Sequence, residues 1–239
     1  MSDPRATPPQ APSPVRPSLR IIFKKSFWNL YDHLGKFLLL SATSVLLALT
    51  VVGLPFAVAG LYGLANDVAD YRTVTLADYF RHGKRGYLTA LKLVAIFLGG
   101  AVVLASNVLF HLEDKLGLPA LSMGMLLLTL WLSLVFFAWL FYLFPLAFRV
   151  GGLSKPVAKS ALGFALDNKA ATAWLLLANL FNWSIGLATF VLLVFLSPAA
   201  SAVLQATASR ELLGKYRPGL VREDEEQRTL KDLFRPWSY

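Results

Sequence analysis

Four long stretches of this sequence contain no charged side chain, and they constrain its fold more than any other feature. They run from Phe37 to Asn66, from Leu93 to Leu112, from Leu116 to Phe148 and from Ala170 to Ser209. Apolar runs of about 18 or more residues are typical of membrane segments, because a soluble helix of that length needs a polar face. The composition agrees, since 56% of the 239 residues are hydrophobic and 15% are charged. The sequence therefore predicts an all-α membrane protein.

The basic residues predict which loops share one side of the membrane. Of the 23 Lys and Arg residues, only Lys115 lies between the second and third stretches, in the short acidic connection Glu113-Asp114-Lys115. Cytoplasmic loops are enriched in Lys and Arg, so both chain termini are expected in the cytoplasm and the Lys115 loop outside. The first and fourth stretches must then each return to the side on which they start, as hairpins.

The lengths of these two stretches and their prolines support the hairpins. The fourth stretch would span about 60 Å as helix, which matches two crossings of a hydrocarbon core about 30 Å thick. The first would span about 45 Å, so its legs are expected to be short or partly re-entrant. Pro55, Pro145 and Pro198 are predicted helix breaks, because proline removes a backbone donor, although a kink is the alternative. The expected fold is a polytopic helical bundle of about six membrane segments, including two Pro-broken hairpins.

Basic, aromatic-rich segments precede several of the apolar stretches and are expected to form interfacial helices on the cytoplasmic side. They are Ile21 to Lys36, Leu76 to Lys92 and Val157 to Lys169. Basic and aromatic residues that alternate at a membrane boundary bind anionic headgroups, so one set is a predicted membrane-surface anchor. Docking of a soluble subunit is the alternative role for these residues. The set is Tyr79, Phe80, Arg81, Lys84, Arg85 and Tyr87.

The chain divides into three regions by composition. Residues 1–20 form a Pro-rich segment that is expected to be a disordered cytoplasmic tail, because it buries too little apolar surface to offset its ordering entropy. Residues 21–217 form the membrane domain, and residues 218–239 form a charged cytoplasmic tail. The net charge of +9 is accounted for by the cytoplasmic loops, so no nucleic acid is expected as a partner.

The sequence lacks the residues on which most chemistry in a membrane depends. It has no cysteine, and the four stretches contain no Lys, Arg, Asp or Glu. Their one histidine, His111, lies at the margin of the second stretch. No metal-binding, hydrolase or nucleotide-binding motif is present, so we expect no metal, no cofactor and no enzymatic activity. Asn179 and Asn182 share one helical face and are expected to bond neighbouring helices. The sharper alternative is a polar cavity for a hydroxyl-bearing ligand.

One region resembles a known family. Between Ser26 and Val94 the chain reads FWNLYDHLGKFLLL and then LPFAVAGLYGLANDVADYRTVTLADYFRHGKRGY. This resembles the YesL-like family of small bacterial integral membrane proteins. The positions that match the family's recurring residues are Pro55, Ala59, Leu61, Tyr62, Asp78, Tyr79 and Phe80. The resemblance implies the bacterial cytoplasmic (inner) membrane as the location. It also implies an accessory role near carbohydrate uptake, with no established activity and no catalytic residue.

Two classes of function remain open from the sequence. The first is a non-catalytic accessory or scaffold component near a carbohydrate-uptake system, favoured by the absence of charge within the membrane segments and by the family resemblance. The second is a transporter or channel subunit for a neutral solute, favoured by the predicted helix breaks, since discontinuous helices often frame binding sites. Beyond the lipid bilayer and its anionic headgroups, the expected partner is another membrane protein or a second copy of the chain. The legs of the two hairpins that contain the prolines are rich in small residues, and these are expected to pack the legs within this chain, with a dimer interface through the same faces as the alternative. The small residues are Ala59 and Gly63 in the first hairpin and Ser197, Ser201, Ala202 and Ala206 in the second.

Overall fold

The computed structural model describes residues 18–113 and 117–216, and within these ranges the secondary structure is helical, without strands. The predictions for residues 1–17 and 217–239, which include most of both tails, lie outside the described residues. The described helices are α1 (Leu19–Asp32), α2 (Leu34–Ala48), α3 (Gly53–Ala69), α4 (Leu76–Leu112), α5 (Pro119–Val150), α6 (Lys155–Asp167), α7 (Lys169–Thr189), α8 (Val191–Phe195) and α9 (Ser197–Tyr216).

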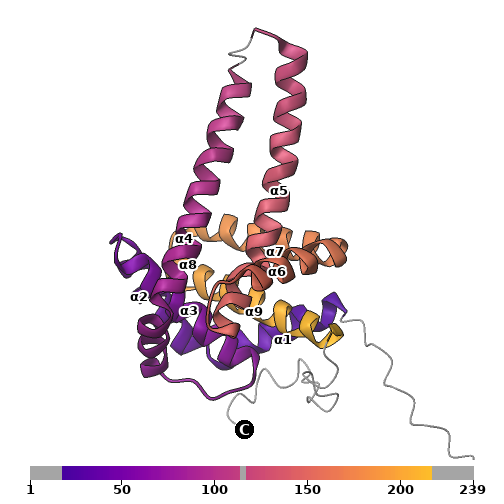
Figure 1. Cartoon of the computed structure of the whole chain (residues 1–239). Helices are drawn as coiled ribbons and strands as arrows, with labels where there is room; N and C mark the ends of the chain where they lie inside the picture. Colours follow the sequence, from indigo (N-terminus) through magenta and orange to yellow (C-terminus); the bar gives the residue numbers. More distant parts are fainter. Residues whose placement is uncertain (1–17, 114–116, 217–239) are drawn as a thin grey trace, which may run out of the picture.

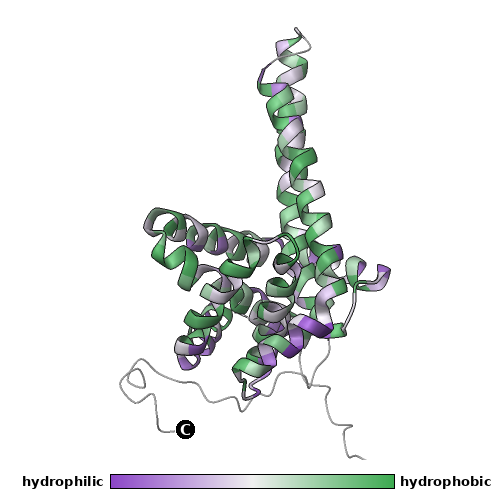
Figure 2. Cartoon of the chain, turned by 90° about the vertical axis from the view of Figure 1, so that its left-hand side faces the viewer, coloured by the Kyte–Doolittle hydropathy of each residue, from purple (hydrophilic) through white to green (hydrophobic). Residues whose placement is uncertain are grey.

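The described chain has two parts of different shape (Figure 1). The first, called the hairpin below, consists of α4 from Leu93 onward, α5 as far as Phe137 and the described residues that connect them. Its two helices pack side by side, with Phe97 against Phe137 and with Phe136 filling the space beside Gly100. The second part, called the base, contains all the other described residues. Figures 1 and 2 both show the hairpin standing clear of the base, and Figure 2 shows most hydrophilic residues in the base.

Helix α4 joins two segments that the sequence predicted separately. The expected interfacial helix, Leu76 to Lys92, and the second apolar stretch are one continuous helix of 37 residues. The helix begins at a capping box, in which the Asp78 carboxylate accepts hydrogen bonds from the backbone N–H and the hydroxyl of Thr75, both at 2.8 Å. No proline separates the two segments, so nothing ends the helix before Leu112.

Helix α3 lies in the middle of the base and packs against α4 and α9. Its glycines allow the close approach, because a Cβ at Gly60 would meet the ring of Tyr79 and a Cβ at Gly63 would meet His82. Of its 17 residues, 12 are buried. The second leg of the first apolar stretch is therefore buried mainly against other helices of this chain.

The fourth apolar stretch forms α7, α8 and most of α9. Helix α7 lies across the direction of the hairpin, at its foot (Figure 1). Phe190, with φ of 49°, separates α7 from α8, because a residue with positive φ cannot continue a right-handed helix. Helix α9 buries 14 of its 20 residues and is a core helix of the base. Two parallel crossings by this stretch are therefore not seen.

The three predicted helix breaks have different outcomes. Pro55 is the third residue of α3, just after the interruption between α2 and α3, and Pro198 is the second residue of α9. A proline in the first turn of a helix is well tolerated, because its missing N–H has no helical partner there. The prediction of a break at Pro145 is wrong, since Pro145 lies inside α5, which continues to Val150. Tight packing around Pro145, which is itself buried, supports the helix there.

Three described helices are long and apolar enough to cross a membrane: α4, α5 and α7. Helix α2 is apolar but shorter. These helices support the prediction of an all-helical membrane protein. The finer prediction of about six membrane segments with two hairpins is not confirmed.

Candidate functional site

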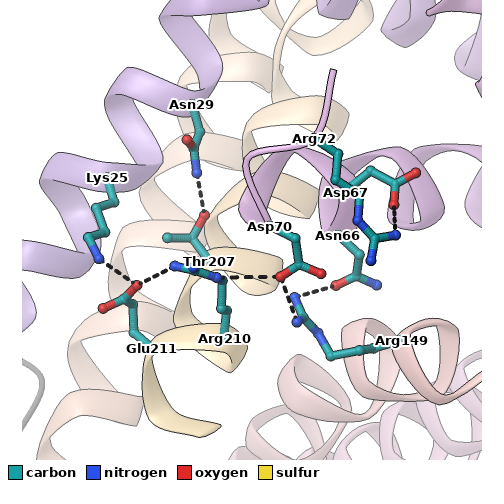
Figure 3. A network of polar contacts seen from close by, with 10 residues as sticks. All are labelled: Lys25, Asn29, Asn66, Asp67, Asp70, Arg72, Arg149, Thr207, Arg210 and Glu211. Carbon is teal, nitrogen blue, oxygen red and sulfur yellow. Dashed lines mark hydrogen bonds and ion pairs between the residues drawn. The ribbon is translucent and has the colours of Figure 1, made fainter. Parts of the chain in front are cut away.

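The densest group of charged side chains lies in the base and joins four helices (Figure 3). Arg149 of α5 donates to Asp70 at the end of α3, with Nη1 2.8 Å from Oδ1. Arg210 Nε of α9 lies 3.4 Å from the same oxygen, and its Nη1 donates to Glu211 Oε1 at 3.1 Å. Lys25 of α1 also donates to Glu211 Oε1, at 2.9 Å. These five residues form one connected ionic network.

Polar neighbours hold the network in place. Asn66, one turn before Asp70 on α3, donates to the Pro145 carbonyl at 3.0 Å and accepts from Arg149 Nη2 at 3.4 Å. The Arg210 guanidinium lies over the ring of Tyr71, 4.9 Å from its centroid. The chain turns at Tyr71, whose φ is 56°. The turn after α3 therefore brings Asp70 and Tyr71 together against the end of α9.

The chemistry of this network fits a structural role. Glu211 and Arg210 are 5% and 7% exposed, so their charges require partners, and each has one in the network. An arginine does not release its proton in a protein, and both carboxylates already accept from cations. No described side chain here is left as an unoccupied base or nucleophile. The network fixes α1, α3, α5 and α9 relative to one another.

A second, smaller group surrounds Asp67. His82 Nε2 lies 2.6 Å from Asp67 Oδ2, and Arg72 Nη1 lies 3.2 Å from Asp67 Oδ1. These contacts tie the base end of α4 to the end of α3. A His–Asp pair can orient a catalytic imidazole, but here Gly63 lies against the imidazole ring rather than a nucleophile. The pair is another helix-to-helix contact.

Buried tyrosines add neutral contacts in the same region. Tyr62 donates its hydroxyl to Gln205 Oε1 at 2.8 Å, which joins α3 to α9. Burial raises the pKa of Tyr62 well above its ordinary value, so the phenol keeps its proton and stays a donor at any physiological pH. Tyr62 also stacks on Phe148 of α5. Tyr62 thus joins α3 to both α9 and α5.

The predicted membrane-surface anchor lies on the base end of α4, but not all of it is at the surface. Phe80 is half-exposed, Tyr87 is partly buried, and the three cations Arg81, Lys84 and Arg85 are exposed. The prediction that Tyr79 lies at the membrane surface is wrong. Its side chain is fully buried and its hydroxyl lies 2.8 Å from Ser44 Oγ of α2, because this face of α4 packs on α2 and α3.

Asn179 and Asn182 both lie on α7. Asn182 Nδ2 donates to the Ser197 carbonyl at 3.0 Å and to Ser201 Oγ at 2.9 Å, so it joins α7 to α9. The Asn179 carbonyl oxygen is buried and has no hydrogen-bond partner. Two hollows in the described surface, of about 290 and 440 Å³, are bordered by other residues. The bonds that Asn182 makes to α9 favour helix bonding as its role.

The larger hollow lies where α6 meets α7, between Asn168, Lys169 and Lys215. The smaller one is apolar and lies where the hairpin enters the base, beside Ile96, Trp139 and Lys155. No cluster of three or more metal-binding side chains occurs in residues 18–113 and 117–216.

The ionic network was not anticipated from the sequence. Lys25, Asp70, Arg149, Arg210 and Glu211 read as ordinary loop charges beside apolar stretches. The available signal was their position, since Arg149 and Arg210 directly follow the third and fourth apolar stretches and are the first charges after them. In the structure both arginines contact the same oxygen of Asp70.

Comparisons with family models, with curated proteins and with solved structures gave no match for this chain. The resemblance to the YesL-like family therefore remains a prediction from the sequence.

Proposed function

We propose that this chain is a non-catalytic accessory or scaffold protein of a membrane assembly, in which the hairpin crosses the bilayer and the base lies on the cytoplasmic side. The uncharged part of α4, from Leu93 to Leu112, is about 30 Å long, the thickness of the hydrocarbon core. Lys92 immediately precedes it and is exposed. The hydrocarbon boundary on the base side then lies close to Lys92.

The distribution of charge supports this orientation. Every described Lys and Arg lies in the base, and the positive-inside rule places such a part in the cytoplasm. Location in a bacterial inner membrane follows from the same proposal together with the family resemblance. The link to a carbohydrate-uptake system rests on that resemblance alone.

The observation that supports the scaffold role is that little of the hairpin surface is covered by the rest of the described chain. Only 11% of the most apolar 18-residue window of α4 is buried within the chain, and 33% of that of α5. Each hairpin helix has the other as its neighbour, and in both views no third helix of residues 18–113 and 117–216 lies beside the outer part of the hairpin. Two helices cannot enclose a solute pathway, whereas their outer faces are open to helices of another protein.

A transporter for a neutral solute is the second candidate, and the broken helix α7–α8 favours it. Transporter sites form where unwound helix ends leave backbone groups facing a ligand. Near this break, however, the Asn182 amide and the Ser197 carbonyl bond each other. These two groups are therefore not free to bind a solute, and we rank the scaffold role first.

Site-specific photo-crosslinking in native membranes tests the proposal. A photoreactive amino acid is placed at Val103 or Leu130, exposed residues of the hairpin, and at Ala77, an exposed residue of the base, as the matched control. We expect the hairpin positions to crosslink one membrane protein in high yield, and the control not to. Crosslinks to lipid alone or to a second copy of this chain would contradict an accessory role. Solute flux in vesicles containing only this protein would favour the transporter.

A further inference from the structure

Polar and apolar residues on α7 are arranged in the reverse of the order found on a water-exposed helix. Bulky apolar side chains cover its outward face: Leu180, Phe181 and Leu187 are 64%, 68% and 68% exposed, and Trp174 and Leu177 lie on the same face. The inward face carries Thr172, Asn182 and Gly186, which are small or polar, and one buried leucine, Leu175. A helix that contacts water has its polar residues outside. The outer face of α7 therefore requires an apolar neighbour.

Helix α2 shows this pattern in part, because it buries two serines beside Phe37 and Leu40 and leaves large apolar residues exposed. Ser41 and Ser44 are buried and hydrogen-bonded, to the Ala199 backbone N–H and to Tyr79 respectively. Leu46 points outward and is 67% exposed. The turn that follows, residues 49–52, is the most exposed apolar segment of the base, with Val51 91% exposed.

These two regions lie at the foot of the hairpin. The short connection 70–75 joins α3 to α4, and the two helices run in opposite directions with Ala59 against Gly86. The first residues of α3 therefore lie towards Lys92 of α4. The turn 49–52 directly precedes α3 and lies at that level (Figure 1). Helix α7 starts beside α5, where the Thr172 and Tyr142 hydroxyls are 3.0 Å apart.

Helices α7, α8 and α2 are neighbours, since α8 packs against both of the others. Their exposed apolar residues therefore form one surface next to the hairpin, which we call the collar. The collar consists of Leu46, Leu49, Val51, Val52, Trp174, Leu177, Leu180, Phe181, Leu187, Phe190 and Val191.

We propose that the collar is embedded in the lipid leaflet on the base side of the membrane and does not cross to the other leaflet. The inference rests on the crossing of the hairpin, because the bilayer that surrounds the hairpin reaches the collar without interruption. The two sequence stretches that supply the collar contain no Lys, Arg, Asp or Glu. Lys36 and Lys169 directly precede those stretches, as expected for lysines at the headgroup level. Lipid acyl chains are thus the neighbours that match the collar.

The position of the collar also explains the length of its helices. Helix α2 is about 22 Å long, too short for the hydrocarbon core, and α7 lies across the hairpin although it is long enough to span. Helices that lie in the membrane plane with one apolar face are a known way of binding one leaflet. The base is then a one-leaflet platform, and the hairpin is its crossing element.

Depth-dependent fluorescence quenching tests the inference. The chain has no cysteine, so single-cysteine variants need no prior substitution. A polarity-insensitive fluorophore is attached to Leu49→Cys or Leu187→Cys in the collar, with Leu180→Cys as a second collar position. Val102→Cys in the middle of the hairpin and Ala77→Cys in the base are the matched controls. The full-length protein is reconstituted in vesicles with a spin label near either the carboxyl end or the methyl end of the acyl chain.

We expect collar labels to lose more fluorescence to the shallow spin label, Val102 to the deep one, and Ala77 to neither. Collar labels as unquenched as Ala77, with Val102 quenched, would overturn the collar and leave the crossing hairpin intact. Collar labels quenched most by the deep spin label would also overturn it, because these segments would then cross. An unquenched Val102 would contradict the crossing hairpin and, with it, the inference.

Discussion

The hairpin and the base use apolar sequence in opposite ways. In the hairpin, Val102 and Leu130 face outward and are 64% and 50% exposed, and few residues are buried. In the base, α3 and α9 are almost as free of charge over most of their length, yet most of their residues are buried against other helices. The base also contains a buried ionic network, whereas the hairpin helices, from Leu93 to Leu112 and from Pro119 to Phe137, contain no Lys, Arg, Asp or Glu.

The difference shows that hydropathy alone does not separate a bare helix from a covered one. An apolar helix needs a neighbour from outside the chain when its outer surface stays bare, and it forms a core when small residues let other helices of the chain cover it. Gly60 and Gly63 in α3 allow α4 to cover that helix. Four substitutions, from the largest expected effect to the smallest, test this distinction between base and hairpin.

The largest effect is expected in the ionic network of the base. Glu211→Gln removes the negative charge that faces Lys25 and Arg210, and we expect a loss of about 3 kcal/mol in the free energy of unfolding. Arg72→Gln, at an exposed ion pair with Asp67, is the control and should cost less than about 1 kcal/mol. Denaturant unfolding in detergent micelles measures both. Equal costs would show that burial of the network adds nothing.

A charge on the bare hairpin should affect insertion. Val102→Arg places a cation at the middle of the proposed crossing, which costs about 3 kcal/mol on insertion scales. We expect less protein in the membrane fraction and more degradation. Ser160→Arg, on the exposed surface of α6, is the control and should insert normally. Normal insertion of both variants would count against a lipid-exposed hairpin.

Alanine substitution at two glycines of the base, one packed and one open, should change stability in opposite directions. Gly60→Ala forces a Cβ against the Tyr79 ring and should destabilise the protein by about 1–3 kcal/mol. Gly163→Ala on α6, where no atom lies within 4 Å of the added Cβ, should stabilise it by up to about 1 kcal/mol. Thermal unfolding in detergent measures the two shifts. The same sign for both would contradict the close α3–α4 packing.

The smallest effect is expected where α4 begins. Thr75→Ala removes the hydroxyl that donates to Asp78, and loss of a helix cap costs about 1 kcal/mol. The exposed neighbour Thr73 provides the control, because Thr73→Ala should leave stability nearly unchanged. Hydrogen exchange of the first turns of α4 detects the local opening. Unchanged exchange in Thr75→Ala would show that packing on α3, not the cap, starts the helix.

The sequence predicted the class of fold because that class depends on composition. Four uncharged stretches require helices, and the structure is helical throughout its described residues. The small residues in the legs that begin near Pro55 and Pro198 predicted close packing within the chain, and α3 and α9 are mostly buried. Hydropathy alone could not have shown this, because a bare helix and a covered helix can have the same hydropathy. The sequence did not predict the continuous helix through Pro145, because tolerance of a proline depends on the packing around it.

The candidate sites were harder to predict than the fold. Asn182 was correctly singled out as a polar group in an apolar helix, but its partners Ser197 and Ser201 depend on how α7 meets α9. Tyr79 looked like a surface aromatic because basic residues follow it closely in the sequence, yet its ring lies against Gly60 of α3 and its hydroxyl bonds Ser44 of α2. The ionic network joins residues as far apart as Lys25 and Glu211, and local spacing carries no information about such contacts.

The sidedness of the hairpin is the most direct test of this account. Leu118→Cys lies at the far end of the hairpin and Ala77→Cys lies in the base, and both residues are exposed. A membrane-impermeant maleimide is added to one side or the other of sealed vesicles that hold the protein in one orientation. The account predicts that the two cysteines react from opposite sides. Reaction of both cysteines from the same side would contradict it, because the hairpin would then not cross the bilayer.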